Sequence, residues 1–296
     1  MKSGFVSIVG RPNVGKSTLL NSIINQKIAI TSNTAQTTRN IIQGIYNDDN
    51  SQIVFVDTPG IHKPHNKLGK ILNEQAYYSM DGVDLVLFLI DVTQEFGKGD
   101  EFVLNKLKES NIPVLLVINK IDKVKYDTIL PKIKQLNDVF DFKEIIPISA
   151  MKKTNIDDLI QTIKNYLTDD IKYYDEDTIT NHGEKFSVSE IIREKVLNLT
   201  HEEVPHSVSC MVDLIEEDKR SVSINAFIIV DRESLKKILI GAKGTMIKNI
   251  GILARKDIEN LLGKKVYLDL KVKVVKNWRD KSSFLAQELG FSDFIE

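Results

Sequence analysis

A glycine-rich segment near the start of the chain, Gly10–Ser17 (GRPNVGKS), constrains the fold more than any other sequence feature. It follows the apolar run Phe5–Val9 and leads into Lys16–Asn25, whose apolar residues recur with helical spacing. Glycines at both ends let such a loop curl, so that successive N–H groups point at one phosphate and the dipole of the following helix adds to the attraction. Strand, loop and helix in this order predict a phosphate-binding turn in an α/β fold.

Strand-like and helix-like segments alternate through the first 167 residues. After the first strand, apolar runs predict buried strands at 39–46, 52–56, 85–90, 114–118 and 145–148. Helical spacing predicts helices over 101–110, 128–139 and 156–167. The turn-forming residues 47–50 join two of the strands into a hairpin. This alternation favours a mixed, mostly parallel sheet with one antiparallel strand, covered by helices on both faces.

A second pattern begins after an acidic stretch without periodicity, which we interpret as a linker over residues 168–183. The order that follows is helix, strand, strand, helix, helix, strand, at 187–203, 208–214, 222–228, 232–240, 245–262 and 266–274. Ser187 and Glu190 have the spacing of a capping box at the start of the first of these helices. The sequence therefore predicts two domains, 1–167 and 184–296, the second a small α+β domain.

Charge is distributed unevenly between these two parts. Between Lys219 and Lys281 there are 16 Lys or Arg and 6 Asp or Glu, a local net charge of +10 in a chain whose total is −1. The rest of the chain therefore carries −11. A separate basic region of this kind indicates a polyanionic partner, most often nucleic acid, whereas the alternative is a solvated lysine-rich surface.

Three short motifs follow predicted strands of the first domain: Asp57–Gly60 (DTPG), Asn119–Asp122 (NKID) and Ser149–Ala150. Ligands of open α/β sheets bind at the carboxyl ends of the strands, so these motifs are expected to lie beside the Gly10–Ser17 loop. Each motif is weak evidence alone. With the Gly10–Ser17 loop they make four motifs in this order, each after a strand, and the four together predict a nucleotide site.

The phosphate side of this site needs positive charge and a metal. Lys16 supplies charge to the β- and γ-phosphates, and the Ser17 hydroxyl is a ligand for magnesium. Asp57 is placed to hold the same ion through water, and the Gly60 N–H is placed to contact the γ-phosphate. This part of the pattern predicts binding of a magnesium–nucleoside triphosphate.

The base side indicates guanine. The Asp122 carboxylate can accept hydrogen bonds from both the N1–H and the exocyclic amine of guanine, a donor pair that adenine lacks. Asn119 is expected to tie this loop to the phosphate loop, and the stem of Lys120 to lie against the base. The Ala150 N–H is expected to reach the guanine O6.

With Gln36–Arg39 (QTTR) as a first switch, these motifs resemble the G domain of the translation-factor class of GTPases. The chain from Gly4 to Phe291 resembles the bacterial Era family, which implies a P-loop GTPase fold followed by a type II KH domain. In that family the second switch threonine, here Thr38, coordinates magnesium and senses the γ-phosphate. Ala35 stands where a proline is common, and 181–183 departs from a more charged linker end.

The resemblance implies GTP, GDP and Mg²⁺ as ligands. It implies catalytic roles for Lys16, Thr38 and Gly60, and magnesium ligands at Ser17, Thr38 and Asp57. It extends the nucleotide contacts to the whole of the four motifs, namely Gly10, Arg11, Pro12, Asn13, Val14, Gly15, Lys16, Ser17, Thr18, Asp57, Thr58, Pro59, Gly60, Ile61, Asn119, Lys120, Ile121, Asp122, Ser149 and Ala150.

Many GTPases carry, after the Asp-x-x-Gly glycine, a glutamine that orients the attacking water. Here that residue is Ile61, which cannot do so. One interpretation is slow hydrolysis supported by the phosphate loop and magnesium. Another is completion of the site by a partner or an ion, since potassium-assisted members of this class place a potassium ligand at the position of Asn13. The alternative for Asn13 is a hydrogen bond within the loop.

In the basic domain, Gly241-Ala242-Lys243-Gly244 separates two predicted helices, as in type II KH domains. The glycines would let the backbone approach nucleic-acid phosphates, with Lys243 facing them and about four nucleotides in an apolar groove. The alternative is a helix–helix turn without a ligand. Trp278 either stacks on a base or covers the core. Cys210 lies on the apolar face of a strand, while His62 and His65 are expected to be exposed loop residues.

The function implied by the resemblance is a GTPase that binds the 3′ end of 16S ribosomal RNA and acts in assembly of the small (30S) subunit, with RNA binding gated by nucleotide state. The alternative is an RNA chaperone or checkpoint scaffold with negligible turnover. A tandem GTPase of the large subunit is disfavoured by the single phosphate loop. One cysteine excludes an internal disulfide, and no apolar run approaches the roughly 18 residues of a membrane span. We expect a cytoplasmic monomer, with peripheral association at the inner face of the cell membrane implied by the resemblance alone.

Overall fold

The computed structural model describes residues 1–34, 36–61 and 64–295. This part of the chain forms two compact units. The first contains Met1–Thr31, Thr38–Pro64 and Leu72–Asn181. The second contains Ser32–Thr37, His65–Ile71 and His182–Glu296. The expectations about Ala35 and His62 lie outside the described residues.

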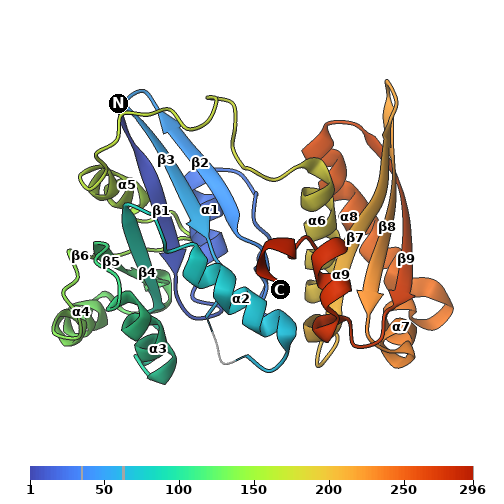
Figure 1. Ribbon diagram of the computed structural model, residues 1–296, viewed down its shortest axis with the longest axis horizontal. Helices are drawn as coiled ribbons and strands as arrows, with labels where there is room; N and C mark the ends of the chain where they lie inside the picture. Colours follow the sequence, from blue (N-terminus) through green and yellow to red (C-terminus); the bar gives the residue numbers. More distant parts are fainter. Residues whose placement is uncertain (35, 62–63, 296) are drawn as a thin grey trace. The chain divides into compact units, whose positions relative to one another are not determined.

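A six-stranded sheet in the order β2-β3-β1-β4-β5-β6 forms the centre of the first unit (Figure 1). Its strands are β1 (Lys2–Val9), β2 (Ile42–Asp48), β3 (Ser51–Asp57), β4 (Leu85–Asp91), β5 (Val114–Asn119) and β6 (Glu144–Pro147). β2 is antiparallel to β3, and all other pairings are parallel. The predicted mixed sheet, with its hairpin, is confirmed.

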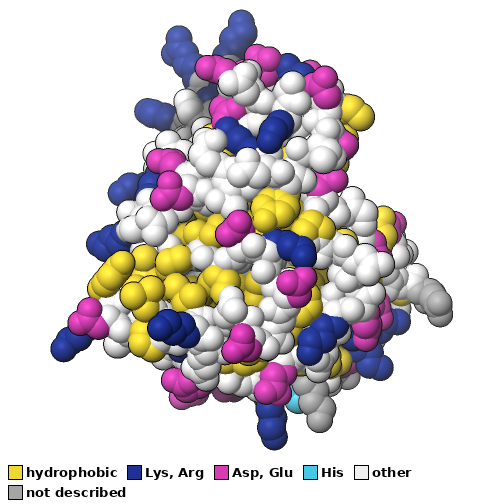
Figure 2. Space-filling view, turned by 90° about the vertical axis from the view of Figure 1, so that its left-hand side faces the viewer, with side chains coloured by type: hydrophobic (Ala, Val, Ile, Leu, Met, Phe, Trp, Pro, Cys, Tyr) yellow, Lys and Arg dark blue, Asp and Glu magenta, His cyan; other side chains and the backbone are white. Residues whose placement is uncertain are grey.

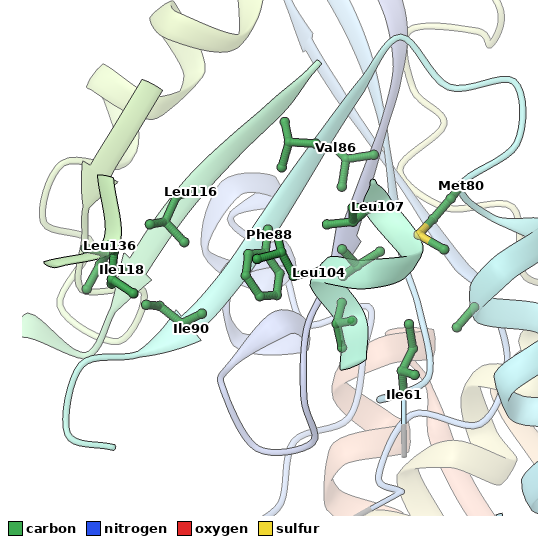
Figure 3. Close-up of a cluster of buried hydrophobic side chains, with 14 of the residues drawn as sticks. Ile61, Met80, Val86, Phe88, Ile90, Leu104, Leu107, Leu116, Ile118 and Leu136 are labelled. Carbon is green, nitrogen blue, oxygen red and sulfur yellow. The ribbon is translucent and has the colours of Figure 1, made fainter. Parts of the chain in front are cut away.

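Helices cover both faces of this sheet (Figure 1). They are α1 (Lys16–Ile24), α2 (Lys67–Tyr78), α3 (Lys98–Leu107), α4 (Ile129–Asn137) and α5 (Ile156–Lys164). On one face, Phe88 of β4 and Leu116 of β5 belong to a buried cluster with Leu104 of α3 and Leu136 of α4 (Figure 3). Because successive strand residues point to opposite faces, the intervening apolar residues of the same strands are available to the other core, and both strands are buried throughout.

One helix within residues 1–167 lies outside the predicted set, and only its part from Leu72 onward belongs to the first compact unit. α2 spans Lys67–Tyr78, a segment that carries apolar residues with helical spacing at Leu68, Ile71 and Leu72. All three side chains are buried. The signal was therefore present in the sequence, but its polar neighbours and the preceding loop made it weaker than the apolar strands on either side.

The edge strand β6 has only four residues and ends at Pro147, which offers no N–H to another strand. Hydrophobic side chains gather on the face of the first unit shown in Figure 2, between scattered charges. The helix α4 packs against β6, and the side chain of its residue Leu130 is 57% exposed. Short length and a proline protect this edge from pairing with another chain.

The expected linker is attached to the first unit over most of its length. The Gln52 side chain, which is buried, accepts hydrogen bonds from the N–H groups of Tyr173 (2.7 Å) and Tyr174 (3.0 Å) and donates to the Tyr174 carbonyl (2.9 Å). Ile45 of β2 donates its N–H to the Ile179 carbonyl at 3.0 Å. The first compact unit accordingly extends to Asn181.

The second unit has the predicted order of helix, two strands, two helices and a strand. The elements are α6 (Glu184–Leu199), β7 (Val208–Glu217), β8 (Ser221–Val230), α7 (Glu233–Ile240), α8 (Thr245–Leu262) and β9 (Lys265–Val274), followed by a short α9 (Ser282–Gln287). β8 is the central strand, antiparallel to β7 and parallel to β9. No helix that the structure describes is both long and apolar enough to span a bilayer.

The predicted start of α6 is wrong. The helix begins at Glu184 after Gly183, so Ser187 and Glu190 lie inside it, and the Ser187 hydroxyl donates to the Gly183 carbonyl at 3.3 Å. Glu190 instead accepts two hydrogen bonds from the buried Arg193, at 2.7 Å to Nε and 2.6 Å to Nη2. A capping-box spacing recurs within helices, where the same side chains have other partners.

Candidate nucleotide and RNA sites

The four motifs of the first unit lie at the carboxyl ends of adjacent strands. The phosphate loop follows β1, the DTPG motif begins on the last residue of β3, and the NKID motif begins on the last residue of β5. The order β3-β1-β4-β5 places these ends along one edge of the sheet. The sheet topology therefore brings together residues that are more than 100 positions apart in the sequence.

The phosphate loop has the backbone that its glycines predict. Gly15 has φ +103°, and a Cβ there would lie 2.4 Å from the Asn119 side-chain nitrogen. That nitrogen donates to the Val14 carbonyl at 2.9 Å. A side chain at Gly15 would therefore push the base loop off the phosphate loop, and only glycine fits both the conformation and the space.

Lys16 is buried within the phosphate loop. Its Nζ donates to the carbonyls of Gly10 (3.2 Å) and Arg11 (3.0 Å). Burial lowers the pKa of Lys16 to about 8, and the nearby Asp57 carboxylate opposes this shift. A buried ammonium whose acceptors are two neutral carbonyls has a strong preference for an anion, which suits a phosphate.

Three oxygen-bearing side chains meet beside the loop. The Ser17 hydroxyl donates to Asp57 Oδ2 at 2.6 Å and lies 2.8 Å from the Thr38 hydroxyl, which donates to the same carboxylate oxygen at 3.4 Å. Burial raises the pKa of Asp57 to about 6, against the lowering effect of Lys16. Among the described residues, Asp57 Oδ1 is buried without a hydrogen-bond partner. Hard oxygen ligands around an unsatisfied carboxylate oxygen fit a magnesium ion.

The base loop is held by its own side chains. Asn119 Oδ1 accepts the N–H groups of Lys120 (2.8 Å) and Ala150 (3.0 Å). The Ser149 hydroxyl donates to Asp122 Oδ1 at 2.6 Å, which orients the carboxylate. Asp122 is itself exposed and available to a base. Three further predicted residues, Thr18, Pro59 and Ile121, are chain neighbours of the site residues described above. The Thr58 hydroxyl donates to the Ile8 carbonyl at 3.0 Å.

Asp91 is a site residue that the sequence motifs do not include. It is the last residue of β4, and its Oδ2 accepts a hydrogen bond from Lys120 Nζ at 2.7 Å. The signal was an acidic residue directly after the apolar run 85–90, at a strand end where the site is expected.

The Ile61 side chain faces the core. It is 2% exposed and belongs to the cluster that contains Met80, Phe88 and Leu104 (Figure 3). Removing it would leave a cavity in this cluster, so its apolar character has a packing reason. An isoleucine side chain buried in this cluster offers the nucleotide loops neither charge nor a hydrogen bond.

The Gly-x-x-Gly turn of the second unit joins α7 to α8. Gly241, Lys243 and Gly244 have φ of +74°, +51° and +78°, and the Lys243 side chain is exposed. A Cβ at Gly241 would lie 2.8 Å from the Met246 backbone nitrogen, whereas one at Gly244 would meet nothing within 4 Å. The turn therefore presents its backbone at the surface, with a lysine on it.

Of the two interpretations of Trp278, the core position is confirmed. Its ring is fully buried against Phe284, and its Nε1–H donates to the Ser207 carbonyl at 3.1 Å. A ring in this position has no free face for a base. Cys210 is buried and His65 is exposed, as predicted.

Known proteins resemble this chain in both of its parts. A family model described as a 50S ribosome-binding GTPase matches residues 5–120, and a KH-domain model matches residues 203–279. The chain is 43% identical to Era in a crystal structure with MgGDPNP and nucleotides 1506–1542 of 16S ribosomal RNA, with 98% of this chain and 99% of that chain covered and a TM-score of 0.95. For an Aquifex aeolicus Era variant bound to GDP.AlF4⁻ the identity is 42%, with the same coverage and TM-score. Such identity over nearly all of both chains, on the same pair of folds, shows that the chain belongs to the Era family of GTPases.

Proposed function

We propose that this GTPase binds the 3′ end of 16S ribosomal RNA through its KH domain and acts in assembly of the small (30S) subunit, with RNA binding gated by nucleotide state. The observation that carries the proposal is the 43% identity to an Era protein whose structure holds both MgGDPNP and nucleotides 1506–1542 of that RNA. The nucleotide site of the first unit and the Gly241–Gly244 turn of the second unit supply the chemistry that suits these two ligands. We propose a cytoplasmic monomer; peripheral membrane association stays a prediction.

In this proposal Ser17, Thr38 and Asp57 would hold magnesium, which would supply positive charge to the phosphates. The residues fit because Asp57 Oδ1 is buried and unpaired within the described part of the chain, while its other oxygen already accepts the Ser17 hydroxyl. Lys16 would exchange its carbonyl partners for phosphate oxygens. Thr38 and Gly60 would contact the γ-phosphate, which makes them sensors of the triphosphate.

Guanine recognition is assigned to Asp122, with Asn119 and Lys120 tying the base loop to the phosphate loop. The Asn119 amide joins Val14 to Ala150, and Lys120 Nζ donates to the Asn13 carbonyl at 2.7 Å. A displacement of the base loop would therefore displace the phosphate loop as well, so that binding of the base and binding of the phosphates are coupled.

RNA binding is assigned to Gly241–Gly244. Exposed lysines lie on the turn and on both sides of it, at Lys237, Lys243 and Lys248. Backbone that can approach phosphates, within a region of net charge +10, suits single-stranded RNA.

We also propose a potassium site at Asn13. This residue has φ +65° in the phosphate loop, and its carbonyl accepts Lys120 Nζ. Ile61 adds no charge near the γ-phosphate, so one more cation would stabilise the developing negative charge of the transition state.

Hydrolysis is expected to be faster in potassium chloride than in sodium chloride at equal ionic strength, because sodium is too small for the same oxygen cage. Asn13→Ala should remove the difference, whereas Asn137→Ala, at an exposed position of α4, should keep it. The measurement is phosphate release by the unmodified protein and both variants. Equal rates in the two salts for the unmodified protein would rule the ion out.

A scaffold with negligible turnover is the second candidate function, and the buried Ile61 side chain favours it. Multiple-turnover phosphate release with and without 30S subunits distinguishes the two. If the 30S subunit completes the catalytic site, it should accelerate phosphate release at least about tenfold, because it would add a contact to the transition state. A rate that stays negligible in both conditions would favour the scaffold.

Crosslinking in cells followed by sequencing of the bound RNA tests the proposed target directly. Reads are expected to concentrate at the 3′ end of 16S ribosomal RNA. Reads spread over unrelated transcripts would contradict the proposed role.

A further inference from the structure

The connection between β4 and α3, residues 91–100, contains none of the four motifs but contacts two of the loops they form. It begins with Asp91, the last residue of β4, and reaches Asp100 in the first turn of α3. Both carboxylates are almost fully buried, with side-chain exposures of 2% and 1%. Each is paired with a cation that belongs to a nucleotide loop.

Asp100 holds Arg11 of the phosphate loop. Arg11 Nε lies 2.8 Å from Asp100 Oδ1, and Arg11 Nη2 donates to Gln94 Oε1 at 3.1 Å. The other carboxylate oxygen of Asp100 accepts the Gly97 N–H at 3.1 Å, which ties the ion pair to the start of α3. The Arg11 side chain is therefore directed at α3 and not at a phosphate.

The space around Arg11 confirms how closely the helix approaches it. A Cβ at Gly99 would lie 2.5 Å from Arg11 Cδ and 3.3 Å from Cγ. Gly99 thus lets the first turn of α3 pack on the arginine stem. A methyl group there would displace Arg11 without removing its carboxylate partner.

Pro12, the residue after Arg11, connects the Arg11–Asp100 ion pair to Gly60, whose N–H is predicted to contact the γ-phosphate. Pro12 is packed so closely on Gly60 that a Cβ at Gly60 would lie 2.9 Å from the Pro12 Cα, N and Cγ atoms. A displacement of the Arg11 backbone would move Pro12, its neighbour in the chain, relative to Gly60. The Arg11–Asp100 pair would in this way act on the position of the Gly60 N–H.

Asp91 acts on a different part of the site. Its Oδ2 accepts Lys120 Nζ at 2.7 Å, while its Oδ1 accepts the N–H (2.9 Å) and hydroxyl (2.7 Å) of Thr93. Lys120 Nζ also donates to the Asn13 carbonyl. Asp91 therefore fixes the junction of the base loop and the phosphate loop, a region used by GDP and GTP alike.

We propose that Asp100 and Asp91 are positioning residues with separable effects. Asp100, through Arg11 and Pro12, sets the γ-phosphate side of the site, and Asp91, through Lys120, sets the base side. Neither touches the nucleotide. Buried, paired side chains of this kind hold a site within the fraction of an ångström that binding and catalysis require.

The test compares Asp100→Asn, Asp91→Asn and a matched control, Asp141→Asn, at an exposed ion pair with Lys143. Affinities for Mg·GDPNP and for GDP are measured by titration, and hydrolysis of bound GTP by single turnover. Asp100→Asn is expected to weaken GDPNP binding about tenfold more than GDP binding and to slow hydrolysis. Asp91→Asn is expected to weaken both nucleotides by the same factor, also about tenfold. The control should change neither affinity.

The ratio of the two affinities is the decisive readout for Asp100, because a loss of fold stability alone lowers both together. For Asp91, whose expected effect on the two nucleotides is equal, an unchanged thermal unfolding midpoint separates a positioning role from a loss of stability. Gly99→Ala supplies a second route to the same displacement if Asp100→Asn does not fold, and it should shift the ratio in the same direction. An unchanged ratio in the folded Asp100 or Gly99 variant would overturn the role of Asp100. A changed ratio in Asp91→Asn would overturn the separation of the two effects.

Discussion

The Asp122→Asn variant is expected to lose GTP affinity on the order of a thousandfold and to gain affinity for xanthosine triphosphate. The Ser149 hydroxyl donates to Asp122 Oδ1, and the amide oxygen of the variant keeps this bond. The new amide nitrogen would then face the N–H groups of guanine, and two donors that meet without an acceptor are unfavourable. Xanthine presents a carbonyl at that position and accepts the amide.

Titration of both nucleotides into both proteins measures this exchange. Asp127→Asn is a suitable control because Asp127 is exposed on the following turn and carries the same charge. Unchanged GTP binding by the Asp122 variant would remove this loop from the base site.

RNA binding is expected to be lost in the Gly241→Asp/Gly244→Asp double variant, with an affinity decrease of at least about a hundredfold. Two carboxylates would stand where backbone must meet phosphate. GTP affinity should stay within about a factor of two, since the substituted turn and the nucleotide site belong to different compact units and share no partners. The measurements are a gel shift with a fragment of the 16S 3′ end and a GTP titration on the same protein.

The structure suggests how to separate charge repulsion from steric clash in this experiment. Gly241→Asp places a Cβ 2.8 Å from the Met246 backbone, whereas Gly244→Asp meets nothing within 4 Å. Gly244 has φ +78°, a left-handed conformation that Asp tolerates better than most residues, so Gly244→Asp alone adds backbone strain but no clash and should keep the fold and still weaken binding. Gly183→Asp/Gly251→Asp adds the same charge at two open positions and should retain RNA binding. Full RNA affinity in the Gly241/Gly244 variant would make this turn a simple helix connection.

The strands were predictable because their signals are local. Buried parallel strands such as 85–90 and 114–118 are continuous apolar runs, and the helix Thr245–Leu262 lies between glycines that end its pattern on both sides. Weaker local signals gave no prediction or a wrong one. The polar residues of α2 obscured its helical spacing, and the capping-box spacing at Ser187 lies inside a helix and not at its start.

The motifs could be located in the sequence for a related reason: they place residues that allow a special backbone conformation, such as Gly15, next to residues that carry a specific chemical group, such as Lys16. Their supporting partners could not be located in this way. Asp91 and Asp100 are two of many acidic residues in the chain, and nothing in the sequence marks them as the partners of Lys120 and Arg11.

The sequence by itself determined the two folds, the order of the motifs and the chemistry that each motif can perform. Only the tertiary structure decided that Ile61 packs in the core, that Trp278 is buried and that residues 168–181 are bound along the first unit. The physical reason is that local signals depend on neighbours in the chain, whereas burial and ion pairing depend on neighbours in space. Those neighbours are set by the order β3-β1-β4-β5, which brings the loops and their supporting carboxylates to one edge of the sheet.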